Sequence, residues 1–288
     1  MGRMVGSRLS IEEQMRAFLM EDIGLGDITS EALIDEGQVA KARLFYREDG
    51  IAAGLEEVET LFRILGCDVT PLETDGNEVK AGEIIMEIEG PARSLLAGER
   101  TALNILGRMA GIATAVAEMV AEASKVSQQI RVASMRKTAP GLRELDKKAV
   151  ALGGGDTHRF RLDDCVLIKD NHLALMPSVA EAVRTARDKV SFTKKIEVEV
   201  GTLEEAVEAA EAGADIIMLD NMPPEEIRRC LAHLAERGLR EGRIYEASGG
   251  INPENVAEYA ASGVDVMSMG FFTHSVRSLN VKLKIEME

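Results

Sequence analysis

From about residue 131 onward, short apolar runs alternate with amphipathic stretches, and this alternation limits the folds open to the chain. The apolar runs are nearly continuous and rich in β-branched residues, as expected of parallel strands buried on both faces. The stretches between them repeat apolar residues at helical spacing and begin with Ser, Thr or Asn caps or with Pro. The pattern predicts an α/β fold. The predicted strands are 130–135, 164–169, 196–200, 215–219, 243–248 and 264–269, and the predicted helices are 143–152, 178–190, 202–213, 223–238 and 252–263.

The residues at the ends of these strands favour a parallel α/β barrel over an open doubly wound sheet. In such a barrel, catalytic groups gather just beyond the C-terminal ends of the strands. Polar loops alone would account for one or two charged strand ends, but poorly for six of complementary types. In chain order, the six ends carry Arg136 and Lys137, Lys169 and Asp170, Glu199, Asp220, Ser248-Gly249-Gly250, and Gly270.

The N-terminal part of the chain has a different pattern, that of an α+β region with its own sheet. Helices are predicted at 15–24 and 57–66, strands within 38–54 and in a hairpin from about 78, and a long helix at about 95–124. We therefore predict an N-terminal α+β domain at 1–112 and a barrel domain at 113–274. The tail, 275–288, alternates like a strand and is predicted to return to the N-terminal sheet.

Charge and composition exclude several classes of protein. The chain has 49 Asp or Glu against 34 Lys or Arg, so it lacks the basic face that nucleic acids need, and its aromatic content of 3% offers little for base stacking. No segment approaches the roughly 20 apolar residues that span a bilayer, and the N-terminus lacks a signal-peptide core. We expect a cytoplasmic protein without nucleic-acid or membrane partners, whose three cysteines, Cys67, Cys165 and Cys230, are free thiols.

One segment opposes this acidity, because residues 131–172 hold nine Lys or Arg against six Asp or Glu. Arg binds a carboxylate through two parallel hydrogen bonds, whereas Lys supplies a compact charge. If the segment's cations meet at the rim of the barrel, they form a pocket for a small molecule with more than one anionic group. The candidate residues are Arg136, Lys137, His158, Arg159 and Lys169.

The turns ASGGIN and SMGFFTHS, after the last two strands, are candidates for a phosphate site. Phosphate binds well to free backbone N–H groups, and barrels often place such a site after their final strands. Ordinary loop geometry also requires glycine, so each turn alone is weak evidence. The candidate residues are Ser248, Gly249, Gly250, Gly270 and His274.

Glu199 and Asp220 are expected between the cation pocket and the phosphate turns. Acids there could chelate Mg²⁺ bound to a phosphate ester, orient ribose hydroxyls, or stabilise a developing positive charge. Pairing with a neighbouring base is the structural alternative for each. Glu197 shares the strand face of Glu199, but Glu199 lies closer to the strand end and is the preferred candidate.

Several long motifs resemble, in order and spacing, those of the quinolinate phosphoribosyltransferase family, also called carboxylating nicotinate-nucleotide pyrophosphorylases. The resemblance covers nearly the whole chain. It implies an N-terminal α+β sandwich domain and an incomplete barrel of seven strands, one more than predicted above. It also implies a homodimer in which the N-terminal domain of one subunit closes over the barrel of the other, with some members forming hexamers. The motifs are ERTALNILGRMAGIAT, RKTAPGLRELDKKAVALGGGDTHR, VLIKDNH, DIIMLDNM, EASGGI and GVDVMSMGFFTHSVR.

The reaction that this resemblance implies joins quinolinate to phosphoribosyl pyrophosphate with Mg²⁺, giving nicotinate mononucleotide, pyrophosphate and CO₂ in de novo NAD biosynthesis. By the same resemblance, Lys137, Glu199 and Asp220 act around the ribose and pyrophosphate, with the two acids holding Mg²⁺ directly or indirectly. The 5'-phosphate is assigned to Ser248, Gly249, Gly250, Gly270 and His274. Quinolinate is assigned to Arg136, His158, Arg159 and Lys169, with Arg100 from the partner subunit.

The chain departs from the family pattern at Met135, where Thr is common, at Thr157, where many members have Asn, and at Phe271-Phe272, where smaller residues are common. The first two departures put the identity of the substrate in question, and none removes a charged group. One alternative is a paralogue from molybdenum-transport operons that acts on another acid or base, although Lys169 in IKDNH favours the quinolinate enzyme. Others are a Schiff-base lyase or aldolase using Lys169 or Lys137, and a non-catalytic binding protein.

Overall fold

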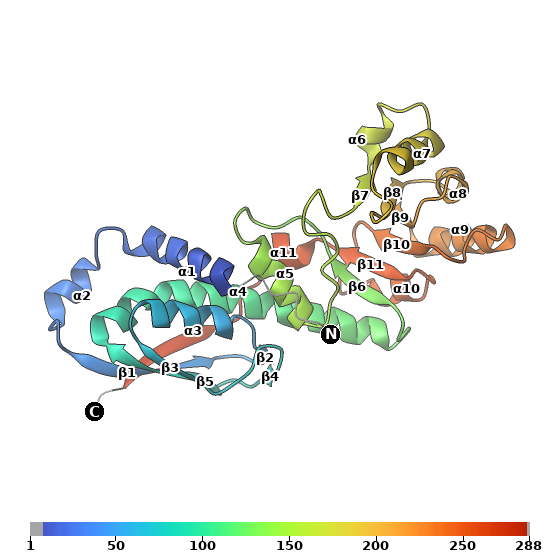
Figure 1. Ribbon diagram of the computed structural model, residues 1–288. Helices are drawn as coiled ribbons and strands as arrows, with labels where there is room; N and C mark the ends of the chain where they lie inside the picture. Colours follow the sequence, from blue (N-terminus) through green and yellow to red (C-terminus); the bar gives the residue numbers. More distant parts are fainter. Residues whose placement is uncertain (1–7, 287–288) are drawn as a thin grey trace. The chain divides into compact units, whose positions relative to one another are not determined.

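The computed structural model describes residues 8–286, which divide into two compact units (Figure 1). The first unit combines the chain up to Ala117 with Pro140–Gly154 and the tail from Ser275, and the second combines Glu118–Ala139 with Gly155–His274. Residues 140–154 thus belong with the first unit, whereas we expected them in the barrel domain. The outermost residues of the predicted domains, 1–7 and 287–288, lie outside the described part of the chain.

The first unit is built on an antiparallel sheet of four strands in the order β12-β1-β5-β3. The last strand of the chain lies beside the first, with Leu44 opposite Leu283. A two-stranded sheet, β2-β4, completes the strand structure of the unit. The strands are β1 (Val39–Tyr46), β2 (Gly50–Ile51), β3 (Asp68–Pro71), β4 (Glu78–Val79), β5 (Ile84–Pro91) and β12 (Val281–Glu286); the helices are α1 (Arg8–Ile23), α2 (Ile28–Leu33), α3 (Leu55–Ile64), α4 (Ala92–Ser124) and α5 (Arg143–Leu152).

Buried and more exposed side chains alternate along β1, so this sheet buries one of its faces. Ala42, Leu44 and Tyr46 are buried, whereas Lys41 is exposed, because successive side chains point to opposite faces. Figure 1 shows α3 and α4 against this sheet. A Cβ on Gly98 of α4 would lie 2.7 Å from Leu65 Cδ1, so glycine permits the close approach of α4 to the end of α3.

The long helix α4 differs from the sequence-based expectation about membranes. In the described part of the chain it is the one helix long and apolar enough to cross a bilayer. In the structure, 56% of its most apolar stretch is buried inside the chain. Burial of this kind is typical of a core helix, which is apolar around most of its circumference.

The second unit contains a parallel six-stranded sheet in the order β6-β11-β10-β9-β8-β7, which confirms the α/β class. Each predicted strand is present, with ends within two residues of the predicted ones. The strands are β6 (Arg131–Ser134), β7 (Val166–Ile168), β8 (Ile196–Val200), β9 (Ile216–Asp220), β10 (Ile244–Ser248) and β11 (Val266–Met269); the helices are α6 (Asp170–Leu173), α7 (Val179–Lys189), α8 (Leu203–Glu211), α9 (Pro224–Glu236), α10 (Val256–Ala260) and α11 (Phe271–His274).

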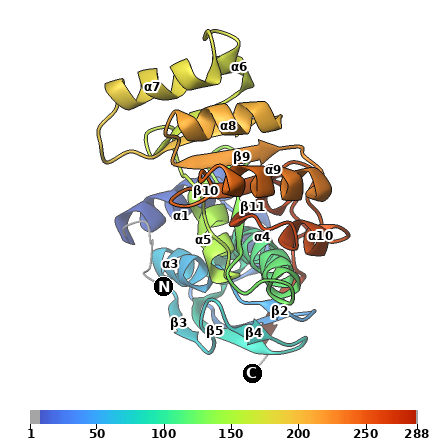
Figure 2. The same cartoon turned by 90° about the vertical axis from the view of Figure 1, so that its right-hand side faces the viewer.

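The helices between these strands begin where the capping residues predicted. Ser178 Oγ accepts a hydrogen bond from the Glu181 N–H, Thr202 Oγ1 accepts one from the Glu205 N–H, and Pro224 is the first residue of α9. Figure 2 shows α7, α8 and α9 following one another along the sheet. The α10 helix begins only at Val256, four residues after the predicted cap Asn252.

The family resemblance implied a seventh strand in the barrel. Among the described residues, the sheet of six strands is extended only by one isolated bridge. Asp156 pairs in parallel with Ala133 at the outer side of β6. The Asp156 N–H donates to Val132 O at 2.7 Å, and the Ser134 N–H donates to Asp156 O at 2.9 Å. This single pairing extends the sheet beyond β6 and directs the chain from Asp156 toward His158.

Candidate active site

Three adjacent strands carry the polar groups of the candidate site in two tiers. The strand registers align Met218 with both Glu199 and Glu246, and Asp220 with Ser248. Side chains two residues apart on a strand share a face, so all these positions lie on one face of the sheet. We call Glu199, Asp220 and Ser248, at the C-terminal ends of their strands, the rim tier, and Glu197 and Glu246, two residues before Glu199 and Ser248, the inner tier.

Lys169 connects the predicted cation pocket to the rim tier. Its Nζ lies 2.7 Å from Glu199 Oε2, and the Glu199 side chain is only 17% exposed. The position of Lys169 is fixed at the start of α6, where its backbone N–H donates to His172 Nδ1 at 3.0 Å. His172 therefore has a structural role, since its side chain accepts this hydrogen bond at the start of α6.

The charges of neighbouring residues at the strand ends act on the Asp220 carboxylate. Its Oδ2 accepts a hydrogen bond from Asn221 Nδ2 at 2.6 Å. Burial and, next, the charge of Glu199 raise the pKa of Asp220, while the Asn221 hydrogen bond, Lys169 and Lys137 act in the opposite direction. Two acids and two lysines that were predicted from four different strand ends thus interact electrostatically in the structure.

The glycine turn after β10 packs tightly against the loop after β9. Gly249 and Gly250 have φ of +95° and +66°, values that favour glycine. A Cβ on Gly249 would lie 2.2 Å from Asn221 Oδ1. The Asn221 N–H donates to Ser248 O at 2.8 Å, and Asn221 itself adopts φ of +55°. The structure therefore joins Asp220 and the predicted phosphate turn through Asn221.

The turn after β11 lies beside the end of β6. A Cβ on Gly270 would lie 3.0 Å from both Lys137 Cδ and His274 Cδ2. Thr273 Oγ1 donates to Lys137 O at 2.9 Å, which holds this turn against the first strand end. The predicted residues Lys137, Gly270 and His274 are thus brought together, and both Lys137 and His274 are exposed.

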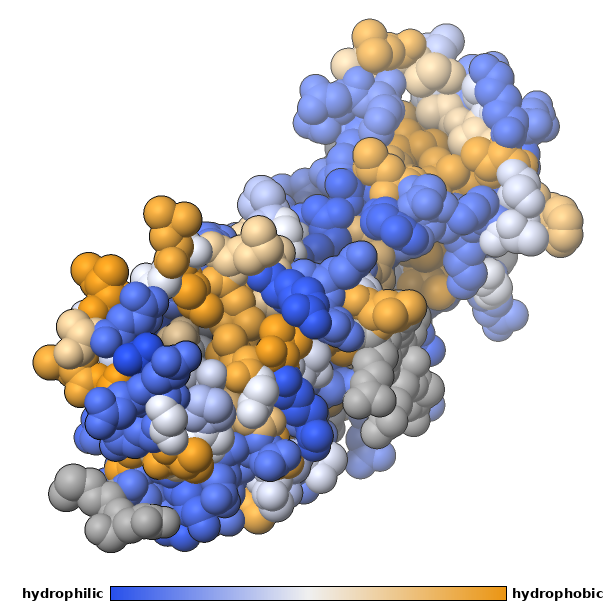
Figure 3. All heavy atoms as spheres, turned by 60° about the vertical axis from the view of Figure 1, so that its left-hand side comes forward, coloured by the Kyte–Doolittle hydropathy of each residue, from blue (hydrophilic) through white to orange (hydrophobic). Residues whose placement is uncertain are grey.

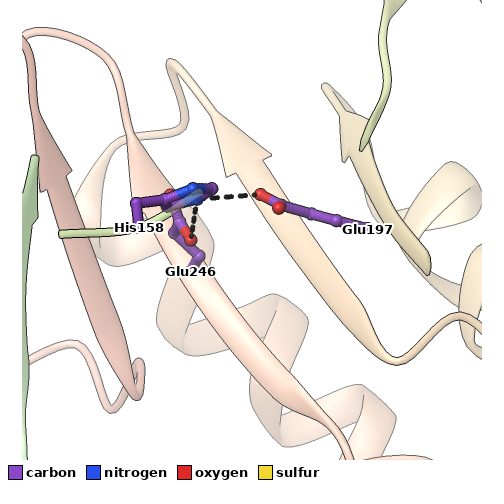
Figure 4. A group of neighbouring side chains, drawn as sticks. All are labelled: His158, Glu197 and Glu246. Carbon is purple, nitrogen blue, oxygen red and sulfur yellow. Dashed lines mark ion pairs between the residues drawn. The ribbon is translucent and has the colours of Figure 1, made fainter. Parts of the chain in front are cut away.

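Both ring nitrogens of His158 are engaged, and Figure 4 shows its contacts with Glu197 and Glu246. Nε2 lies 3.4 Å from Glu197 Oε1 and 3.3 Å from Glu246 Oε2. On the other side of the ring, Nδ1 accepts a hydrogen bond from the Arg159 N–H at 2.7 Å. The backbone of His158 has φ of +53°, a conformation uncommon for a side chain of this kind.

The protonation of these three side chains is coupled. Burial by itself lowers the pKa of His158, but hydrogen bonds and charges from Glu197 and Glu246 raise it to about 10. Burial also raises the pKa of Glu197. Because interacting groups titrate as a set, the raised pKa values belong to the cluster and not to His158 alone. The Arg159 N–H occupies Nδ1, so Nε2 carries the ring hydrogen and any further proton of the cluster lies on a carboxylate.

The cluster has donors suited to a metal ion, since its ligand atoms lie within 4.8 Å of one another. However, the Arg159 N–H uses the Nδ1 lone pair, so the ring hydrogen lies on Nε2, the atom that faces the carboxylates. A metal ion would have to displace this hydrogen from a nitrogen already placed as a donor. The geometry therefore favours direct contact between Nε2 and the two carboxylates.

The remaining predicted residues lie in two places. Arg136 and Arg159 are half-buried in the second unit, and Arg159 Nη1 donates to Cys165 O at 3.3 Å. Arg100 is exposed on α4, in the first unit. The residue-based reading missed Asn221 and Glu246 and ranked Glu197 below Glu199. The signal for Glu246 was available, because it precedes Ser248 by two residues and shares its face.

Comparisons with known protein families match both parts of the chain. Residues 27–110 match the family model of the quinolinate phosphoribosyl transferase N-terminal domain, and residues 112–284 match the model of its C-terminal domain. Together these two matches span nearly all the residues that the structure describes.

Individual relatives agree with these family matches. The chain is 49% identical over 271 residues to a probable carboxylating nicotinate-nucleotide pyrophosphorylase of Methanothermobacter thermautotrophicus, covering 94% of this chain and 97% of that protein. It is 39% identical to the human nicotinate-nucleotide pyrophosphorylase, covering 88% and 85%. The crystal structure of NadC from Streptococcus pyogenes matches with a TM-score of 0.92 and 36% identity, covering 99% of each chain.

Proposed function

The chain belongs to the quinolinate phosphoribosyltransferase family, and from that premise we propose which of its residues perform the reaction. The enzyme transfers a phosphoribosyl group from phosphoribosyl pyrophosphate to quinolinate in NAD biosynthesis, with loss of CO₂. This assignment decides against the Schiff-base lyase and the non-catalytic protein among the alternatives. The observation that carries the residue assignment is the common electrostatic field of Lys137, Lys169, Glu199 and Asp220.

We assign the two adjacent carboxylates of quinolinate to Arg136, Arg159 and Lys169, together with Arg100 of the partner subunit. Support comes from the half-buried positions of Arg136 and Arg159, where a charged hydrogen bond is only weakly screened by water. We assign His158 an indirect role in this pocket, because both its ring nitrogens are engaged in contacts within the chain.

Glu199 and Asp220 would hold Mg²⁺ together with the ribose and pyrophosphate groups. Their carboxylate oxygens suit this ion, and the charge of Glu199 helps to raise the pKa of Asp220, a repulsion that a cation would relieve. When bound, Mg²⁺ would offset negative charge on the pyrophosphate. Lys137, exposed beside Gly270, is assigned to the same departing group.

The 5'-phosphate is assigned to the two glycine turns, through Ser248, Gly249, Gly250, Gly270 and His274. Two features support this assignment. Left-handed backbone at Gly249 and Gly250 can turn successive N–H groups toward one anion. Gly270 lacks a side chain at the point where Lys137 and His274 approach its backbone, so both of these potential cations can lie beside the turn.

These assignments imply a sequence of bond changes in which the protein mainly binds and orients. Departure of pyrophosphate leaves positive charge on the ribose, which the carboxylates of Glu199 and Asp220 stabilise. The quinolinate nitrogen then forms the bond to the sugar and becomes cationic. The neighbouring carboxylate leaves as CO₂, its bonding electrons stay on the ring carbon beside this cationic nitrogen, and that carbon takes up a proton.

We also propose a cytoplasmic homodimer. Several large apolar side chains of α1, α2 and the loop between them are exposed, and Figure 3 shows apolar atoms on this region of the first unit. Exposed apolar surface of this kind marks an interaction site. The partner that we assign to it is a second copy of the chain, as in the dimer that the family resemblance implies. The exposed residues are Leu9, Met20, Leu25, Ile28 and Leu33.

The reaction itself is tested by incubating the protein with phosphoribosyl pyrophosphate, Mg²⁺ and either quinolinate or nicotinate. Mononucleotide and CO₂ should form in equal amounts from quinolinate. Folded protein that forms no product from quinolinate would contradict the assigned activity, and omission of Mg²⁺ in the presence of a chelator tests the metal requirement separately.

The quinolinate pocket is tested by Arg159→Ala. Loss of a buried charged hydrogen bond should raise the quinolinate KM by roughly 30-fold or more, with a much smaller change in the phosphoribosyl pyrophosphate KM. Arg161→Ala is the matched control, because Arg161 is 72% exposed and pairs with Asp163 at 3.5 Å. Equal rises of both KM values in Arg159→Ala would contradict the assignment.

A further inference from the structure

The inner tier places two acidic side chains where a barrel is usually filled with apolar residues. The Glu197 side chain is fully buried and that of Glu246 is 3% exposed. They come from β8 and β10, two strands separated by β9, and alternate strands commonly supply one layer of a barrel interior. Burying two carboxylates is costly unless they are paired, so their presence requires an explanation.

His158 is the partner that the structure gives to both acids. Within the described residues, both Glu197 oxygens and Glu246 Oε1 accept no conventional hydrogen bond, and the ion-pair contacts of His158 Nε2 are at 3.3 and 3.4 Å. The imidazole therefore lies between one backbone N–H on its Nδ1 side and two buried carboxylates on its Nε2 side. Figure 4 shows the two carboxylates.

This arrangement fixes the backbone that carries Arg159. The His158 N–H donates to Asp156 Oδ1 at 2.8 Å, and the chain then turns through the left-handed conformation of His158. An uncommon conformation of this kind persists when surrounding contacts hold it in place. The contacts here are the Asp156 carboxylate, the Arg159 N–H and the two inner-tier glutamates.

We propose that Glu197 and Glu246 are positioning residues for quinolinate: they anchor His158, and His158 holds the Arg159 backbone so that its guanidinium can meet the substrate. This inference rests on the proposed role of Arg159. The two glutamates act through His158 and touch no substrate. Their effect is on one substrate only, because the phosphate turns and the rim tier do not depend on the Arg159 backbone.

The test compares Glu197→Gln and Glu246→Gln in the full-length enzyme. Each change keeps the side-chain volume but removes the charge that draws Nε2 inward. The quinolinate KM should rise about tenfold to a hundredfold, as expected for a misplaced binding group, while the phosphoribosyl pyrophosphate KM and kcat change little. Met218→Leu, an apolar change on the intervening strand β9, is the control, and its KM values should change less than about threefold.

A double variant tests whether the glutamates act through His158. His158→Gln should reproduce the selective rise in quinolinate KM. Combining His158→Gln with Glu246→Gln should add nothing beyond the larger single effect, because both changes break one chain of contacts. Additive losses would overturn the proposal. Unchanged phosphoribosyl pyrophosphate KM in each variant shows that the site is folded.

The possible outcomes separate this inference from the proposed function. If the Gln variants behave like Met218→Leu while Arg159→Ala loses quinolinate binding, the positioning role fails and the proposed pocket stands. If Arg159→Ala also leaves quinolinate binding unchanged, both fail. Stoichiometric metal bound to the purified enzyme and lost in Glu246→Gln would overturn the proposal in favour of a metal site.

Discussion

Two described residues other than glycine adopt positive φ, and both belong to the candidate site. His158 turns the chain toward Arg159, and Asn221 bridges Asp220 and the turn at Gly249. A left-handed conformation costs free energy for a residue with a side chain, although Asn tolerates it better than most. At both positions the side chain makes hydrogen bonds or ion pairs that compensate for this cost.

Replacing Asn221 separates the contribution of its side chain from that of its backbone. Asn221→Gly suits the backbone but removes the hydrogen bond to Asp220, so kcat/KM for phosphoribosyl pyrophosphate should fall by roughly tenfold to a hundredfold. Asn221→Ala should lose the same activity and also about 1 to 2 kcal/mol of unfolding free energy. Steady-state kinetics and urea unfolding measure the two effects. Wild-type kinetics in Asn221→Gly would show that this hydrogen bond does not matter for the reaction.

Among the elements, α5 is the one whose surroundings the sequence did not predict. Its Lys148 reaches three acids of the first unit, with Nζ 2.7 Å from Glu56, 2.8 Å from Glu57 and 3.6 Å from Asp75. The Lys148 side chain is only 14% exposed. Burial alone lowers the pKa of Lys148, but these acids outweigh it and raise the pKa above the ordinary 10.5. This network explains why residues 140–154 pack with the first unit.

Lys148→Met should therefore destabilise the protein by about 3 to 5 kcal/mol, because it leaves acids buried without their cation. A raised lysine pKa means that the stabilisation is complete below pH 10.5 and is lost as pH rises through the raised value. The free energy of unfolding is measured in urea between pH 7 and 11 for wild type and variant. The difference between the two values should shrink above pH 10.5.

Arg16→Met is the control, since Arg16 forms an exposed pair with Glu12 and should change stability by less than about 0.5 kcal/mol. A comparable loss in both variants would argue against the network.

The sequence predicted the parallel strands and main helices because their apolar periodicity is strong. It missed β3, α6 and α11, which are four residues each, and the seventh strand position, where GGGDTHRFR has no apolar run and forms one bridge at Asp156. The rim tier was predictable because strand ends carry function in barrels. The position of Glu246 on the face of Ser248 was predictable, but its role was not, because its contact with His158 appears only in the structure.

At the scale of the whole molecule, the proposal that Arg100 acts in the site of the partner subunit can be tested by combining two variants. Arg100 is exposed in the first unit, and Lys137 is exposed in the second. If Arg100 completes the site of the partner subunit, two inactive variants can restore each other. Each mixed dimer would contain one site with both substitutions and one site with neither.

Co-expression of Arg100→Ala and Lys137→Ala should therefore recover about a quarter of wild-type activity, because half of randomly paired dimers are mixed and each has one intact site. Each variant alone should be nearly inactive. Differently tagged copies allow the mixed dimer to be purified and its activity in the quinolinate assay measured. Mixed dimers that remain inactive would contradict a site shared between subunits.

The pairing of β12 with β1 has a consequence for the order in which the protein is made. Among the described strands, β1 is the first that the ribosome synthesises and its partner β12 is the last. At ordinary translation speeds, on the order of tens of seconds separate the synthesis of the two strands. During that time the hydrogen-bonding edge of β1 is open to other chains. The nascent chain must therefore keep that edge from aggregating until β12 has been made.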